Sequence, residues 1–62
     1  MKNKIQFLVD NGLSVSAIAR NSGVNATHLN KYLHGSANFS AEKEEKLRLW
    51  LREYKELVIA NL

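Results

Sequence analysis

Residues 14–35 have the sequence SVSAIARNSGVNATHLNKYLHG, which contains two short helical patterns on either side of Gly23. Ser14 is a favoured N-cap for the first pattern, residues 15–22, and Asn25 for the second, residues 26–34. Gly23 and Gly35 follow the two patterns, and glycine there accepts the positive φ with which many helices end. The spacing predicts two short helices joined by a tight turn.

The two predicted helices have apolar faces that fit against each other. Ala19 is small enough for the helices to approach closely, and Val24 lies in the turn between them. The inner face of the first helix contains Val15, Ile18 and Ala19. The apolar face of the second contains Ala26, Leu29, Tyr32 and Leu33. Its opposite face is polar and basic, with Thr27, Lys31 and His34, and we expect it to be exposed.

Helical patterns also flank this pair on both sides. Residues 3–11 place Ile5, Leu8 and Val9 at helical spacing and end at Asn11-Gly12. Ser40 is an N-cap candidate for a long helix over residues 41–60. The core stripe predicted for that helix is Leu47, Trp50, Leu51, Tyr54, Leu57 and Val58. No segment alternates as a strand does, so we expect an all-α domain, a compact four- to five-helix bundle over residues 1–62.

Length and composition exclude several classes of protein. The chain has 62 residues, no Cys, no Pro and a formal net charge of +3. Such a chain supports one small core and no disulfide. His28 and His34 lie on different sides of one helix with no further ligand, and no nucleophile stands with a base, so we expect no metal, no cofactor, no small-molecule substrate and no enzyme activity. The longest apolar run, residues 57–60, is too short to span a membrane, and no export signal is recognisable, so we expect a cytoplasmic, nucleoid-associated protein.

Positive charge is concentrated in the first part of the chain. Residues 1–39 carry Lys2, Lys4, Arg20 and Lys31 against the single carboxylate of Asp10, whereas residues 40–62 carry equal numbers of basic and acidic side chains. A local excess of positive charge fits an anionic partner such as nucleic acid, and it equally fits an ordinary solvated surface.

Residues 14–35 resemble the helix-turn-helix of the Cro and phage-repressor family, an XRE-like, lambda-repressor-like DNA-binding domain. The resemblance is carried by Ala19-x-x-x-Gly23-Val24 and Leu29-x-x-Tyr32-Leu33-x-Gly35, with Ser14 and Asn25 at the N-cap places. It implies that the second helix lies in the major groove of double-stranded DNA. The residues that it implies as base contacts are Asn25, Ala26, Thr27 and Lys31, with His28 and Asn30 at the edges of the contact.

Phosphate contacts are expected around this helix, at Arg20, His34, Ser36 and Asn38. The chain departs from the family at Val15, where relatives often have a polar residue that binds a phosphate, and Ser14 or Ser16 are the possible substitutes. It departs again at residues 36–39, a loop that is often basic in the family and here carries no charge. Both departures predict few cationic contacts.

The resemblance implies a transcriptional regulator of phage or prophage type, a repressor that acts as a homodimer on operator DNA. A dimer contact is expected at apolar residues of the last segment that lie off the core stripe, namely Leu49, Ile59 and Leu62. The alternative is a protein-interaction module that keeps the helix-turn-helix core within a larger regulatory assembly.

Overall fold

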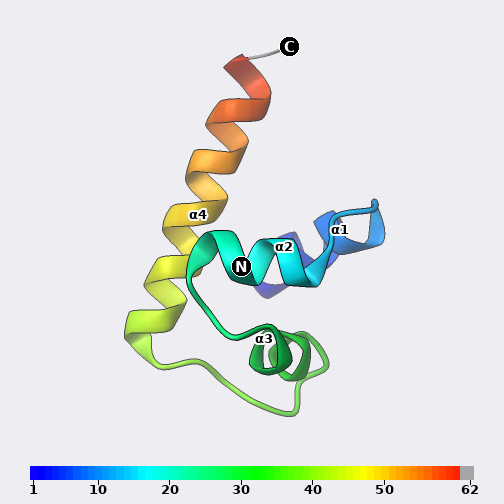
Figure 1. The fold of residues 1–62 in the computed structure, drawn as a ribbon, viewed down its shortest axis with the longest axis vertical. Coiled ribbons are helices and arrows are strands. Elements are labelled where there is room, and N and C mark those ends of the chain that lie inside the picture. The colour runs from blue at the N-terminus through cyan, green and yellow to red at the C-terminus, as the bar shows by residue number, and fades with distance from the viewer. Residues whose placement is uncertain (61–62) are drawn as a thin grey trace.

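The computed structural model describes residues 1–60, which form four α-helices and no strand. The helices are α1 (Lys2–Asp10), α2 (Val15–Ser22), α3 (Ala26–Leu33) and α4 (Ala41–Ala60). The predicted all-α class is confirmed, with α2 and α4 at their predicted bounds and α1 and α3 within one residue of theirs. Figure 1 shows α1, α2 and α3 gathered around the first half of α4, whose second half projects beyond them. No helix within residues 1–60 is both long and apolar enough to cross a membrane.

Side-chain caps explain why three helices begin where they do. Ser14 Oγ accepts a hydrogen bond from the backbone N–H of Ala17 at 3.2 Å, and Asn25 Oδ1 accepts one from His28 at 3.0 Å. Ser40 Oγ accepts from the backbone N–H of Lys43 at 3.3 Å. Each cap satisfies a donor that the first turn leaves without a helical partner, and contributes about 1 kcal/mol. All three predicted N-caps are confirmed.

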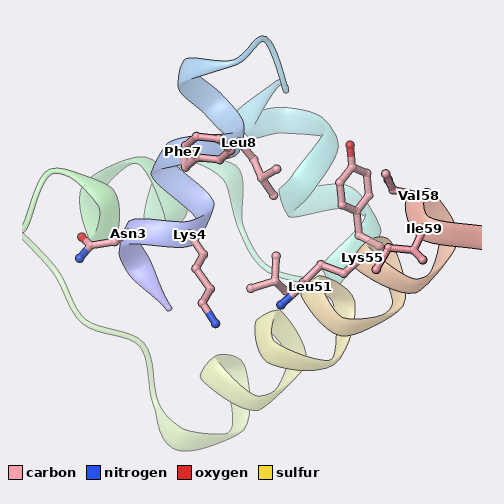
Figure 2. Close-up of a pocket in the computed structure, with 9 residues that line it drawn as sticks. Asn3, Lys4, Phe7, Leu8, Leu51, Lys55, Val58 and Ile59 are labelled. Atoms are coloured by element: carbon pink, nitrogen blue, oxygen red, sulfur yellow. The ribbon is translucent and has the colours of Figure 1, made fainter. Parts of the chain in front are cut away.

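The two halves of α4 have different surroundings. Leu47 and Leu51 are buried, whereas Leu57 is 62% exposed and Val58 is 39% exposed. The prediction that the core stripe continues to Val58 is therefore wrong at Leu57 and Val58. The physical reason is length: α4 has 20 residues and is about 30 Å long, whereas α1, α2 and α3 have eight or nine residues and span roughly 12–14 Å. The second half of α4 instead faces α1 across an open groove (Figure 2).

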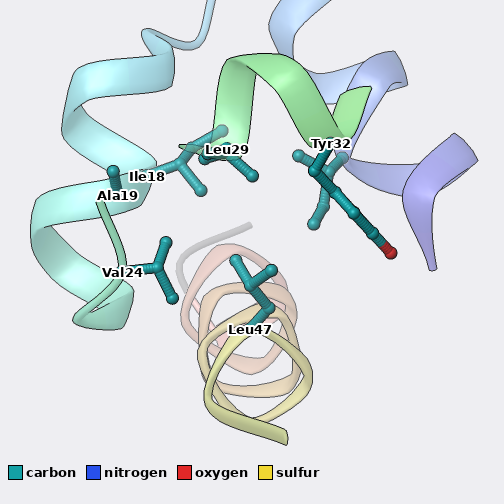
Figure 3. Close-up of a cluster of buried hydrophobic side chains, with 7 residues drawn as sticks. Ile18, Ala19, Val24, Leu29, Tyr32 and Leu47 are labelled. Atoms are coloured by element: carbon teal, nitrogen blue, oxygen red, sulfur yellow. The ribbon is translucent and has the colours of Figure 1, made fainter. Parts of the chain in front are cut away.

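The core takes one fully buried aliphatic side chain from each helix: Ile5, Ile18, Leu29 and Leu47. Ala19, Val24 and Tyr32 complete the cluster, most of which Figure 3 shows converging between α2, α3 and α4. Burial of each large aliphatic side chain contributes about 1.5–3 kcal/mol. These residues hold α3 by its inner face, because α3 packs on α2 and on α1.

Gly23 forms the turn between α2 and α3 with φ +85°, and its N–H donates to Ala19 O at 2.9 Å. A Cβ at this position would meet nothing nearer than Lys46 Cδ, 3.9 Å away, so glycine is required for its backbone conformation and not for space. We expect Gly23→Ala to lower the free energy of unfolding by about 1–2 kcal/mol, the usual cost of a left-handed residue with a Cβ. Gly23→Asn should cost less, because asparagine tolerates this region. Urea denaturation of both variants tests this, and equal losses would contradict it.

Candidate nucleic-acid interface

Four polar side chains form a stripe along the outside of α3. Thr27, Asn30, Lys31 and His34 are all exposed, and their spacing of three and four residues places them on one face of the helix, here called the α3 outer stripe. Leu29 and Tyr32, on the opposite face, are buried in the core. Within residues 1–60, no hydrogen bond or ion pair engages the side chain of Thr27 or Lys31. The stripe therefore combines a fixed backbone with polar groups available to a ligand.

Asn25 and Ala26, both expected to contact bases, lie differently from the stripe. Asn25 Oδ1 accepts the capping hydrogen bond from the backbone N–H of His28, which occupies one of its two lone pairs and ties the side chain to the first turn of α3. Its amide nitrogen remains as a donor at the start of α3. Ala26 is half-buried and packs against the core, so its methyl group belongs mainly to the inner face.

His28 has a structural role that the sequence did not reveal. Its Nε2 lies 3.0 Å from the carbonyl oxygen of Asn38, and its ring stacks on Phe39 with centroids 4.5 Å apart. Phe39 also meets the ring of Tyr32 at 4.9 Å. His28, expected at the edge of a DNA contact, therefore fastens the loop before α4 onto α3. The one sequence signal for this arrangement was an aromatic residue in a loop of small polar residues.

Some of the side chains expected to contact phosphates form hydrogen bonds within the protein, and others do not. Ser36 Oγ donates to Lys31 O at 3.2 Å, which closes the end of α3, and Ser14 Oγ caps α2. The side chains of Ser16, Arg20 and Asn38 are exposed and carry no hydrogen bond within the described residues. Ser16 and Arg20 are therefore the candidates on α2, and Asn38 is the candidate in the loop.

The segment that carries the α3 outer stripe has basic but no acidic side chains. Residues 11–41 contain no Asp or Glu, and their basic side chains are Arg20 and Lys31, beside the two histidines. Behind the stripe, burial of Tyr32 and then the nearby carboxylate of Glu44 raise the pKa of the phenol above its usual value of 10.0, so Tyr32 stays neutral at physiological pH. Lys2 Nζ lies 5.4 Å from the centroid of the Tyr32 ring, which adds a cation beside α3.

Two of the residues expected to form a dimer contact, Leu49 and Ile59, lie ten residues apart on α4. Leu49 is 44% exposed and Ile59 is 69% exposed, but only Ile59 lines the groove between α1 and α4. Leu62 lies outside the described residues. The groove also contains Phe7 and Val58, of which Phe7 was not singled out from the sequence and Val58 was expected in the core.

Residues 1–60 contain no group of three or more His, Asp or Glu side chains arranged to hold a metal ion. A scan of the chain against protein-family models finds no match, and neither does a search of curated proteins or of solved structures.

Proposed function

We propose that this chain binds double-stranded DNA sequence-specifically, with α2 and α3 as a helix-turn-helix and α3 in the major groove. Its role would be that of a transcriptional regulator, a phage- or prophage-type repressor that acts as a homodimer on operator DNA. The observation that carries the proposal is the α3 outer stripe, a polar and basic surface on a helix anchored from behind by Leu29 and Tyr32. The stripe lies in residues 11–41, which contain no carboxylate side chain, so no acidic residue of this segment would repel the phosphates of DNA.

The dimensions and donors of α3 fit a major groove. An α-helix with its side chains is about 10–12 Å across, which fits the major groove's width of about 12 Å. In that pose Lys31 donates to guanine O6 or N7, and the Thr27 methyl group meets the methyl group of thymine. His34 at the end of the stripe, together with the exposed Ser16 and Arg20 of α2, would contact phosphates and set the register. Few cations are involved, so we expect a shallow salt slope of about −2 to −4 per bound subunit.

Selection from a random duplex library at low salt tests the proposal, followed by footprinting of the selected sites. A recurring short motif that is protected from cleavage supports sequence-specific binding. A pool that stays random after several rounds, with no footprint, contradicts it. A Thr27→Ala/Lys31→Ala double variant carried through the same selection is the matched control, because both positions are exposed and their replacement leaves the core unchanged.

One such module buries only about 600–1,000 Å² on DNA, so two copies are proposed to occupy half-sites about 34 Å apart. Leu49 is proposed at their contact because it is a large apolar residue exposed on the first half of α4. We expect Leu49→Glu to leave the fold intact and to weaken self-association. Sedimentation equilibrium measures this, and a wild-type chain that is monomeric at high micromolar concentration, with one copy per site on DNA, would contradict the homodimer.

A second function, a protein-interaction module, is favoured by a separate observation, the apolar groove between α1 and α4.

A further inference from the structure

A hollow lies between α1 and the projecting half of α4 (Figure 2). Its volume is about 590 Å³, within the size range of binding clefts. Phe7 is 65% exposed and Ile59 is 69% exposed, although both are large apolar residues. The floor is apolar and aromatic, formed by Phe7, Leu8, Leu51, Tyr54, Val58 and Ile59. Contiguous apolar surface of this kind marks binding sites in monomeric proteins.

The shape of the groove suits a helix. Its α4 wall consists of residues spaced by three, four, seven and eight positions from Leu51, which all lie on one face of the helix, and its α1 wall is centred on Phe7. The wall from Leu51 to Ile59 is about 12 Å long, or roughly two turns. A third helix lying between two diverging helices buries a stripe of its own apolar residues, the usual helix-in-groove mode.

The rim of the groove is positively charged. Lys4 of α1 and Lys55 of α4 line it, and a smaller hollow that shares both residues adds Arg48, Arg52 and Glu56. Arg48 is paired with Glu45 on its own helix. Lys4, Arg52 and Lys55 form no ion pair within residues 1–60. An occupant with carboxylates beside its apolar stripe would meet these three cations.

We propose that the α1/α4 groove binds an amphipathic helix of another protein, with an apolar stripe against the floor and Asp or Glu residues on its flanks. A second copy of this chain fits less well, because face-to-face contact brings the Lys4, Arg52 and Lys55 side chains of both copies together. A DNA backbone fits less well, because it offers nothing apolar to cover Phe7, Val58 and Ile59. No residue of α2 or α3 lines the groove, so this site goes beyond DNA binding and does not depend on it.

A displayed library of helical peptides of about 16 residues, roughly 24 Å long, provides the probe. Each member carries apolar residues at every third or fourth position, with Glu, Lys, Gln and Ser randomised equally at the flanking positions. We expect selection on the wild-type chain to enrich peptides that carry Glu at the flanking positions. A Phe7→Asp/Ile59→Asp variant should select no peptide. Leu57→Asp, which changes an exposed aliphatic residue on the same half of α4 that does not line the groove, should select the same peptides as wild type.

Charge reversal tests the rim separately. A Lys4→Glu/Lys55→Glu variant should bind a selected Glu-flanked peptide at least about tenfold more weakly and should prefer its Lys-flanked counterpart. Lys46→Glu, an exposed change on α4 outside the groove, is the matched control and should leave peptide affinity unchanged. Circular dichroism of every variant verifies that the fold is retained.

Three results would overturn the proposal. The first is a set of selected peptides that shows no preference for Glu at the flanking positions, or that the Phe7→Asp/Ile59→Asp variant selects as well as wild type does. The second is a wild-type dimer that the same double variant dissociates, since the occupant would then be a second copy. The third is a loss of DNA affinity in the Lys4→Glu/Lys55→Glu variant with peptide binding unchanged. Peptide binding is measured in the absence of DNA, so the two proposals are tested independently. Failure of the groove proposal does not affect the DNA-binding proposal, and failure of the DNA-binding proposal does not affect the groove proposal.

Discussion

Leu29→Ala is expected to lower the free energy of unfolding by about 2–5 kcal/mol, the largest stability loss of any single truncation in α3. Leu29 has no exposed surface and lies in the cluster to which all four helices contribute. Its truncation removes apolar burial and leaves a cavity that four short helices cannot easily close. The total free energy of unfolding of a domain of this size is only about 3–5 kcal/mol, so much of the Leu29→Ala population should be unfolded at 25 °C. Thermal and urea denaturation followed by circular dichroism measure the loss.

Leu49→Ala is the matched control for Leu29→Ala. It deletes the same atoms from a side chain that is 44% exposed, and it should change the free energy of unfolding by about 0.5 kcal/mol or less. Comparable losses for the two variants would contradict the placement of Leu29 at the centre of the core. Under the proposed function, a folded but less stable Leu29→Ala chain should also bind a selected DNA duplex more weakly, because Leu29 anchors the helix that carries the α3 outer stripe.

Thr27→Ala and Lys31→Ala are each expected to cost about 1–3 kcal/mol of binding free energy on a selected DNA site and much less on unrelated DNA. Both side chains are exposed on one face of α3 and are engaged by no other described residue, so their loss changes the contact surface and not the fold. Arg20→Ala should behave differently. As a phosphate contact it should weaken binding about equally on all sequences and reduce the salt slope by about 1.

Fluorescence anisotropy on selected and scrambled duplexes, at several salt concentrations, measures both effects. Lys55→Ala is the control, because Lys55 is an exposed cation of α4 that lines the α1/α4 groove, to which no residue of α2 or α3 contributes. If Lys31→Ala weakens binding to the selected and the scrambled duplex by the same factor, Lys31 contacts phosphate and does not distinguish bases. No change on either duplex would contradict a DNA contact through this stripe.

Local chemistry made the helix bounds predictable. Ser14 caps α2 through Ala17, Asn25 caps α3 through His28, and Ser40 caps α4 through Lys43, each over three residues of chain. Such bonds depend only on neighbouring residues, so the sequence indicates them directly. The positive φ of Gly23 and the buried faces of α2 and α3 follow in the same way from short spacing. The outward position of Thr27 and Lys31 was therefore predictable.

Contacts between distant segments required the tertiary structure. His28 and Asn38 are ten residues apart, and their contact, with Phe39 stacked on His28, depends on how the loop returns to α3. Periodicity likewise placed Leu57 and Val58 on the apolar side of α4, but it carries no information on how far the neighbouring helices extend. Because α1 to α3 are short, the second half of α4 leaves the core and forms a groove with Phe7, from the opposite end of the chain. Local sequence thus determines where the helices begin and which faces they bury on one another, whereas the relative lengths and packing of the helices determine which apolar residues remain available to a partner.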